Sequence, residues 1–151
     1  VGMPAIDEAW CARFRAALRA TPIPTTVAAA LEPLKNTLGE DNVRAILSKC
    51  EAKRAAWTNV TPPRLEQLGL PKEFMECALG IHAYTLTSPL YVGLNSSMYS
   101  ADRDVGPDGM SAALRDFLPY IRLLQHALEM LPSRFKAAGQ VVYRGVQHTR
   151  M

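Results

Sequence analysis

Residues 110–131 read MSAALRDFLPYIRLLQHALEML, the longest amphipathic segment of the chain. Apolar side chains recur every three or four positions, which is the period of a helix that buries one side. At about 1.5 Å per residue, this helix would span on the order of 30 Å. A helix of that length needs other elements to cover its apolar side, so the segment predicts packing against further helices. The predicted buried seam consists of Leu114, Phe117, Leu118, Ile121, Leu124, Leu128 and Leu131.

The preceding segments show the same helical period and are the natural covering layer. Residues 7–20 form one predicted helix, which the Thr-Pro-Ile-Pro run at 21–24 ends. A second apolar stripe covers residues 27–38, where Pro33 either kinks the helix or starts a new one. Asp41 is the predicted N-cap of a third helix. Further helical starts are expected at Thr61-Pro62-Pro63, Leu70-Pro71 and Ser88-Pro89.

Residues 140–146 read QVVYRGV and form a short apolar strand in this interpretation. A single short strand leaves its backbone groups without a neighbour, so it belongs to a sheet. The predicted fold class is therefore all-α: a multi-helix lobe with a short C-terminal β-strand that belongs to a missing sheet. We expect the chain to be a piece of a larger protein. Its predicted parts are an N-terminal helical segment (1–70), a helical lobe (71–138) and the first strand of an absent β-core (139–151).

Composition excludes several classes of partner. The chain has 151 residues and a net charge of +3, and acidic residues interrupt the basic ones. The nearest approach to a basic cluster is Arg44, Lys49, Lys53 and Arg54, which is typical of a solvated helix face. We therefore expect no nucleic-acid partner. We also expect no membrane partner, since no segment is long and apolar enough to span a bilayer.

Cysteine and histidine usage bears on metals and on the compartment. Cys11, Cys50 and Cys77 are odd in number and lack zinc-ligand spacing, so they are expected to be free thiols. This mildly favours a reducing compartment. Secretion stays open, because the triplets at Asn59 and Asn95 match the glycosylation pattern. The three histidines are not grouped, and we expect no metal site.

From Tyr84 onward, an ordered set of motifs carries a family resemblance. The chain resembles the amino-terminal half of the arginine-directed mono-ADP-ribosyltransferases over roughly residues 74–147. In that family, a helical lobe ends in a helix and Leu-Pro, and the first strand follows with Tyr-Arg-Gly. The matching segments are Ala83-Tyr84-Thr85, LYVGLN at 90–95, Leu114-Arg115, LEMLP at 128–132 and VYRGV at 142–146.

The resemblance implies a reaction and a set of contacts. The family transfers the ADP-ribosyl group of NAD to a protein side chain, often arginine, and releases nicotinamide. Arg144 matches the arginine that binds the NAD pyrophosphate region, and a guanidinium fork suits phosphate oxygens. The cofactor-binding residues we expect are Arg144, Tyr143, Gly145, Tyr84 and Asn95. A packing role stays open for Tyr143 and Tyr84, and a hydrogen bond to neighbouring backbone stays open for Asn95.

The chain also departs from the family pattern. It contains no Ser-Thr-Ser, and its eight glutamates include no Glu-x-Glu. In the family, those glutamates stabilise the oxocarbenium-like centre, so no catalytic residue is expected in this chain. The functional prediction is an inactive N-terminal fragment of an NAD-dependent mono-ADP-ribosyltransferase. Its substrate NAD and its protein acceptor would be bound by the complete enzyme, and the terminal strand could mediate self-association. The alternative is a non-catalytic helical protein-interaction module.

Overall fold

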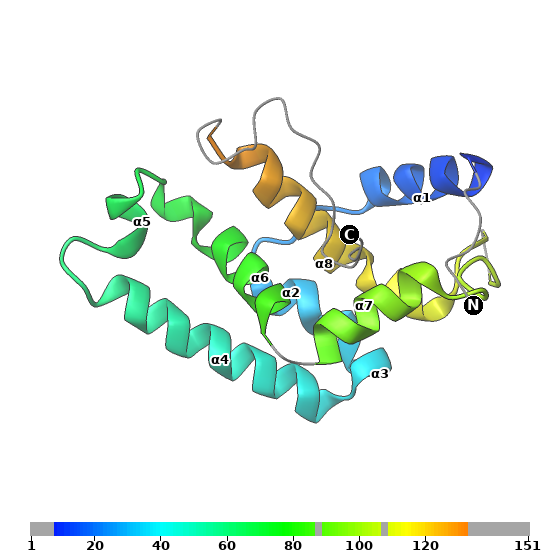
Figure 1. The fold of residues 1–151 in the computed structure, drawn as a ribbon, viewed down its shortest axis with the longest axis horizontal. Coiled ribbons are helices and arrows are strands. Elements are labelled where there is room, and N and C mark those ends of the chain that lie inside the picture. Colours follow the sequence, from blue (N-terminus) through cyan, green and yellow to red (C-terminus); the bar gives the residue numbers. More distant parts are fainter. Residues whose placement is uncertain (1–7, 87–88, 107–108, 133–151) are drawn as a thin grey trace, which may run out of the picture.

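The computed structural model describes residues 8–86, 89–106 and 109–132. Every regular element in these ranges is a helix, which confirms the predicted all-α lobe (Figure 1). The strand predicted at residues 140–146 lies outside the described residues. The elements are α1 (Glu8–Ala20), α2 (Val27–Leu31), η1 (Glu32–Leu34), α3 (Lys35–Leu38), α4 (Glu40–Thr58), α5 (Arg64–Gln67), η2 (Lys72–Phe74), α6 (Met75–Thr85), α7 (Pro89–Tyr99) and α8 (Ala112–Met130).

Helix α8 is the central element of the lobe. Its N-cap is Ser111, whose hydroxyl oxygen accepts a hydrogen bond from the Leu114 N–H at 3.1 Å. It packs against α1, α2, α6 and α7. In Figure 1, α1 and α4 lie on opposite sides of α8. The long amphipathic segment therefore does organise the fold, as its sequence predicts.

The buried face of α8 differs in part from the predicted seam. Leu114, Phe117 and Leu118 are buried, as expected. Tyr120 and Leu123 are also buried, although they were not assigned to the seam. The prediction is wrong at its far end, where Leu128 is 59% exposed. The reason is that the flank covered in the second half of α8 follows Leu123 and Ala127, which are both buried, so Leu128 lies on the neighbouring flank.

The chain turns sharply between α2 and α4 without a linker. Pro33 starts a new turn rather than kinking a continuous helix, because it lies in η1 between α2 and α3. Gly39 then ends α3 and serves as the N-cap of α4, with a φ of 93° that favours glycine. The prediction that Asp41 is an N-cap is therefore wrong. Asp41 lies in the first turn of α4, where it accepts a hydrogen bond from Arg44 at 2.8 Å.

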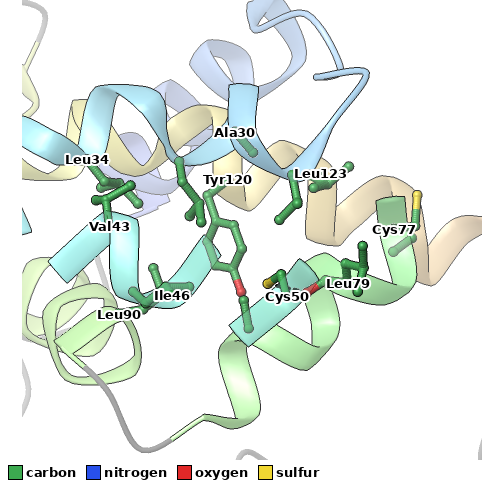
Figure 2. Close-up of a cluster of buried hydrophobic side chains, with 14 of the residues drawn as sticks. Ala30, Leu34, Val43, Ile46, Cys50, Cys77, Leu79, Leu90, Tyr120 and Leu123 are labelled. Atoms are coloured by element: carbon green, nitrogen blue, oxygen red, sulfur yellow. Dashed lines mark hydrogen bonds between the residues drawn. The ribbon is translucent and has the colours of Figure 1, made fainter. Parts of the chain in front are cut away.

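Tyr120 lies in the middle of the main hydrophobic core (Figure 2). Its side chain is fully buried, and its hydroxyl donates to the carbonyl oxygen of Gly80 in α6 at 2.7 Å. Burial raises the pKa of Tyr120, so the hydroxyl remains a donor. Burial likewise raises the pKa of Cys50 to about 11. All three cysteines are free, as predicted, and Cys50 and Cys77 are buried.

Glu76 joins three helices through one carboxylate. One oxygen accepts from the N–H of Val27 at 3.0 Å, in the first turn of α2, where helical N–H groups lack helical partners. The other accepts from Arg54 of α4, which also pairs with Glu51. Burial works against ionisation of Glu76, but the bonds from Arg54 and Val27 outweigh it and lower its pKa. The two bonds that Glu76 accepts, from Val27 and from Arg54, therefore fix where α2, α4 and α6 meet.

Replacing Tyr120 by phenylalanine tests the buried hydroxyl. Tyr120→Phe keeps the ring but removes the donor to Gly80, so the free energy of unfolding should fall by about 1 kcal/mol. Tyr91→Phe is the matched control, because Tyr91 is 40% exposed and should change stability by less than about 0.5 kcal/mol. Urea denaturation followed by circular dichroism measures both. Equal effects in the two variants would contradict a special role for this bond.

A second prediction concerns the pH dependence of stability. Glu76 has a folded pKa below its ordinary value of 4.5, so its contribution is present above pH 4.5 and is lost as pH falls through the folded value. At pH 7, Glu76→Gln should lower the free energy of unfolding by about 2 kcal/mol. This difference from the parent protein should narrow as the pH drops below 4.5.

Denaturation curves at neutral and acidic pH measure the narrowing. Glu73→Gln is the control, because Glu73 is exposed and lies close to Glu76 in sequence. That variant should follow the parent protein at every pH. A gap between Glu76→Gln and the parent protein that stays constant with pH would show that ionisation of Glu76 is not the source of the stabilisation.

Candidate functional site

An apolar groove of about 380 Å³ opens between α6, α7 and α8. Its α8 wall is the part of the predicted seam that other helices leave uncovered. None of the lining residues carries a formal charge. They are Ile81, Tyr84, Leu94, Asn95, Met98, Tyr99, Ile121, Leu124 and Leu128.

The groove brings together two of the predicted NAD-contacting residues, Tyr84 and Asn95. Tyr84 stands near the end of α6, and its ring meets the ring of Tyr91 edge-on, with centroids 5.1 Å apart. The Asn95 amide nitrogen donates to the backbone carbonyl of Tyr91 at 2.8 Å. Tyr91 on α7 therefore contacts both residues and orients them. Tyr84 thus has the packing contact, and Asn95 the hydrogen bond to neighbouring backbone, that the sequence left open beside a role in NAD binding.

The lining of the groove limits its chemistry. A diphosphate carries negative charge that must be matched by cations or by several N–H donors. No lysine or arginine lines the groove in the described part of the chain. Tyr84, Tyr99 and the aliphatic side chains instead suit a flat ring or another apolar surface. A nucleotide that used this groove would need a guanidinium from elsewhere in the protein.

The other three predicted contacts, Tyr143, Arg144 and Gly145, lie outside the described residues. In the part that the structure does describe, no group of three or more His, Cys, Asp or Glu side chains could hold a metal ion. Over the same residues, no helix combines the length and apolar character needed to cross a bilayer.

Comparison with known families adds a finding that geometry alone does not provide. The family model described as NAD:arginine ADP-ribosyltransferase matches residues 27–151. The chain belongs to this family. The matched range contains the groove and also the segment with Tyr143, Arg144 and Gly145. Neither a curated protein nor a solved structure matches the chain.

Membership of the NAD:arginine ADP-ribosyltransferase family confirms the resemblance seen in the sequence. Enzymes of this family use NAD as substrate and modify protein acceptors. The matched range begins at residue 27, so it includes α2 through α8 and leaves out α1. The groove between α6, α7 and α8 is thus part of the family domain.

The sequence prediction missed most of the groove lining. Ile81 and Met98 were not predicted as site residues, because single apolar residues on neighbouring helices are usually core. Leu124 and Leu128 were assigned to the core for the same reason. The sequence of α8 did indicate an uncovered apolar surface, because its apolar residues cover more of the helix circumference than one packing partner can bury. Only the positions of α6 and α7 show which of them stay accessible.

The apolar character of the groove can be tested with a charge placed on its wall. Leu128→Lys should weaken binding of the neutral dye Nile red several-fold, because the ammonium group opposes burial of an apolar ligand. Val92→Lys is the matched control, since Val92 is 61% exposed, against 59% for Leu128, but does not line the groove. Fluorescence titration measures both affinities. Equal weakening in the two variants would place the dye elsewhere.

Proposed function

We propose that these residues supply the helical lobe of an NAD-dependent mono-ADP-ribosyltransferase that modifies arginine side chains of a protein acceptor. Membership of the NAD:arginine ADP-ribosyltransferase family is the observation that carries this proposal. The groove supports it, because Tyr84 and Asn95 line the same surface although they are eleven positions apart on different helices. Family membership also favours the enzyme hypothesis over the alternative of a non-catalytic interaction module.

In this proposal, the NAD contacts divide by chemistry. The guanidinium of Arg144 binds the diphosphate, since a planar fork of donors matches phosphate oxygens. Tyr143 and Gly145 flank it, and glycine lets the ligand approach the backbone closely. Tyr84 and Asn95 contact an uncharged part of the dinucleotide across the groove. The division accounts for a groove whose described lining has no cation and for an arginine that stands in a different segment of the sequence.

The catalytic carboxylates come from residues beyond these 151. An oxocarbenium-like transition state needs a carboxylate beside it, and the chain has no Glu-x-Glu and no Ser-Thr-Ser. The 151 residues alone are then inactive. The proposed organisation is an N-terminal helical segment at 1–70, the transferase lobe at 71–138 and a first core strand at 139–151. The same strand provides an edge for self-association.

NAD binding by the 151-residue chain tests the role of Arg144. We expect weak binding, with a Kd of roughly 1 mM, because one guanidinium cannot form a nucleotide pocket. Arg144→Lys should weaken it further by about tenfold, since an ammonium group cannot form the bidentate contact. Line broadening of the adenine protons of NAD measures this range of affinities.

Arg150→Lys is the matched control, because it makes the same change six positions away and should leave NAD binding unchanged. Equal weakening by both variants would remove Arg144 from the NAD contacts. Transfer of labelled ADP-ribose from NAD to an arginine-rich protein by the 151-residue chain would overturn the proposal that its carboxylates are missing.

A further inference from the structure

Arginine side chains line the surface clefts on both sides of α1. Arg13 and Arg115 line a cleft of about 570 Å³ together with Gly109 and Met110. A second cleft, of about 260 Å³, contains three further arginines. These are Arg15, Arg19 and Arg122, and Leu18, Gln125 and Glu129 complete the lining. We call the two clefts together the α1–α8 surface.

The arginines of α1 differ from those of α4 in their partners. On α4, Arg44 pairs with Glu40 and Asp41, and Arg54 pairs with Glu51 and Glu76. On α1, Arg13, Arg15 and Arg19 are exposed, and within the described residues none of them forms an ion pair. Two of the four members of the basic cluster seen in the sequence, Arg44 and Arg54, are therefore paired with carboxylates. In the described part of the chain, Arg13, Arg15 and Arg19 therefore keep their positive charge without an ion pair, and Glu129 is the one carboxylate among the residues that line the two clefts.

The guanidinium group of Arg122 on α8 is held in place by neutral acceptors. Arg122 donates to the Thr21 carbonyl at 3.3 Å and to the Gln125 side-chain oxygen at 2.7 Å. Arg115 donates to the Met110 carbonyl at 3.1 Å. Neutral acceptors orient Arg122 without cancelling its charge. An incoming anion would meet pre-positioned donors and would lose less side-chain entropy on binding.

The α1–α8 surface also has an apolar component. Ala16, Ala17, Met110 and Leu118 line the larger cleft beside its two arginines. Such a lining suits aliphatic side chains, while the guanidinium groups suit carboxylates. We propose that the α1–α8 surface binds an acidic polypeptide segment whose carboxylates alternate with apolar side chains.

The aromatic residues of α1 argue against a nucleic acid as the partner. Single-stranded nucleic acids bind by stacking their bases on accessible aromatic rings. Trp10 is 3% exposed, its ring stacks on Phe14 at 5.2 Å, and Arg103 lies 4.0 Å from its ring centroid. Its indole N–H also donates to the Gly109 carbonyl. These rings attach α1 to the fold and are not a stacking platform.

The proposed partner surface is independent of the NAD contacts. It includes α1, which precedes the family match at residue 27, and it does not share lining residues with the groove. Failure of NAD binding would therefore not count against acidic-peptide binding at this surface. Failure of acidic-peptide binding would likewise not count against NAD binding.

Fluorescence anisotropy of the whole chain with a labelled peptide tests the inference. The probe is an eight-residue peptide of alternating glutamate and leucine, and its counterpart has glutamine in place of glutamate. We expect the acidic peptide to bind at 50 mM salt, the glutamine peptide not to bind, and binding to weaken at 500 mM salt. The double variant Arg15→Gln with Arg19→Gln should bind the acidic peptide at least tenfold more weakly than the parent protein.

The matched control is Lys49→Gln with Lys72→Gln, which removes the same charge from exposed positions away from α1. It should change peptide affinity by less than threefold. Thermal unfolding of both double variants shows that the fold is retained. Equal loss in the two double variants, absence of acidic-peptide binding, or tighter binding of an RNA oligonucleotide of equal charge would each overturn the proposal.

Discussion

The close approach of α6 and α8 is the constraint on which the lobe depends. Gly80 permits it, because a Cβ atom at that position would lie 3.0 Å from a methyl group of Leu123. The same backbone position presents its carbonyl to the buried Tyr120 hydroxyl. One glycine therefore serves both the apolar contact and the polar contact between the two helices. The remaining helices arrange themselves around that pair.

The position of the groove follows from this packing. Since α6 and α2 contact α8 on the flank that holds Tyr120 and Leu123, the neighbouring flank with Leu124 and Leu128 faces outward. α7 then crosses beside it and contributes Leu94 and the orienting residue Tyr91. The groove is thus an outcome of where α6 sits on α8. Residues far from the proposed NAD contacts can shift it by changing that packing.

The bounds of the helices could be predicted from the sequence better than the contacts between them. Proline, glycine and the apolar period mark starts and ends locally, so α1, α4 and α8 could be located within a few residues. The N-cap of α4 was misplaced because Gly39 both ends one helix and begins the next, which no propensity for Asp41 reveals. Tyr84 and Asn95 could be named from a family motif. Their shared groove and the arginines of the α1–α8 surface could not, since Arg19 and Arg122 are about a hundred positions apart in the chain.

The carboxylate of Glu76 has a consequence for how the lobe comes apart. It receives donors from α2 and α4 while it belongs to α6, so opening α2 or α4 removes one of the two donors of this part-buried charge, and opening α6 removes the acceptor of both. That penalty is shared, and fraying of one helix is discouraged by the other two. Amide protons of α2, α4 and α6 would then exchange with solvent in a single cooperative event, even though α2 has only five residues and could not persist as an isolated helix.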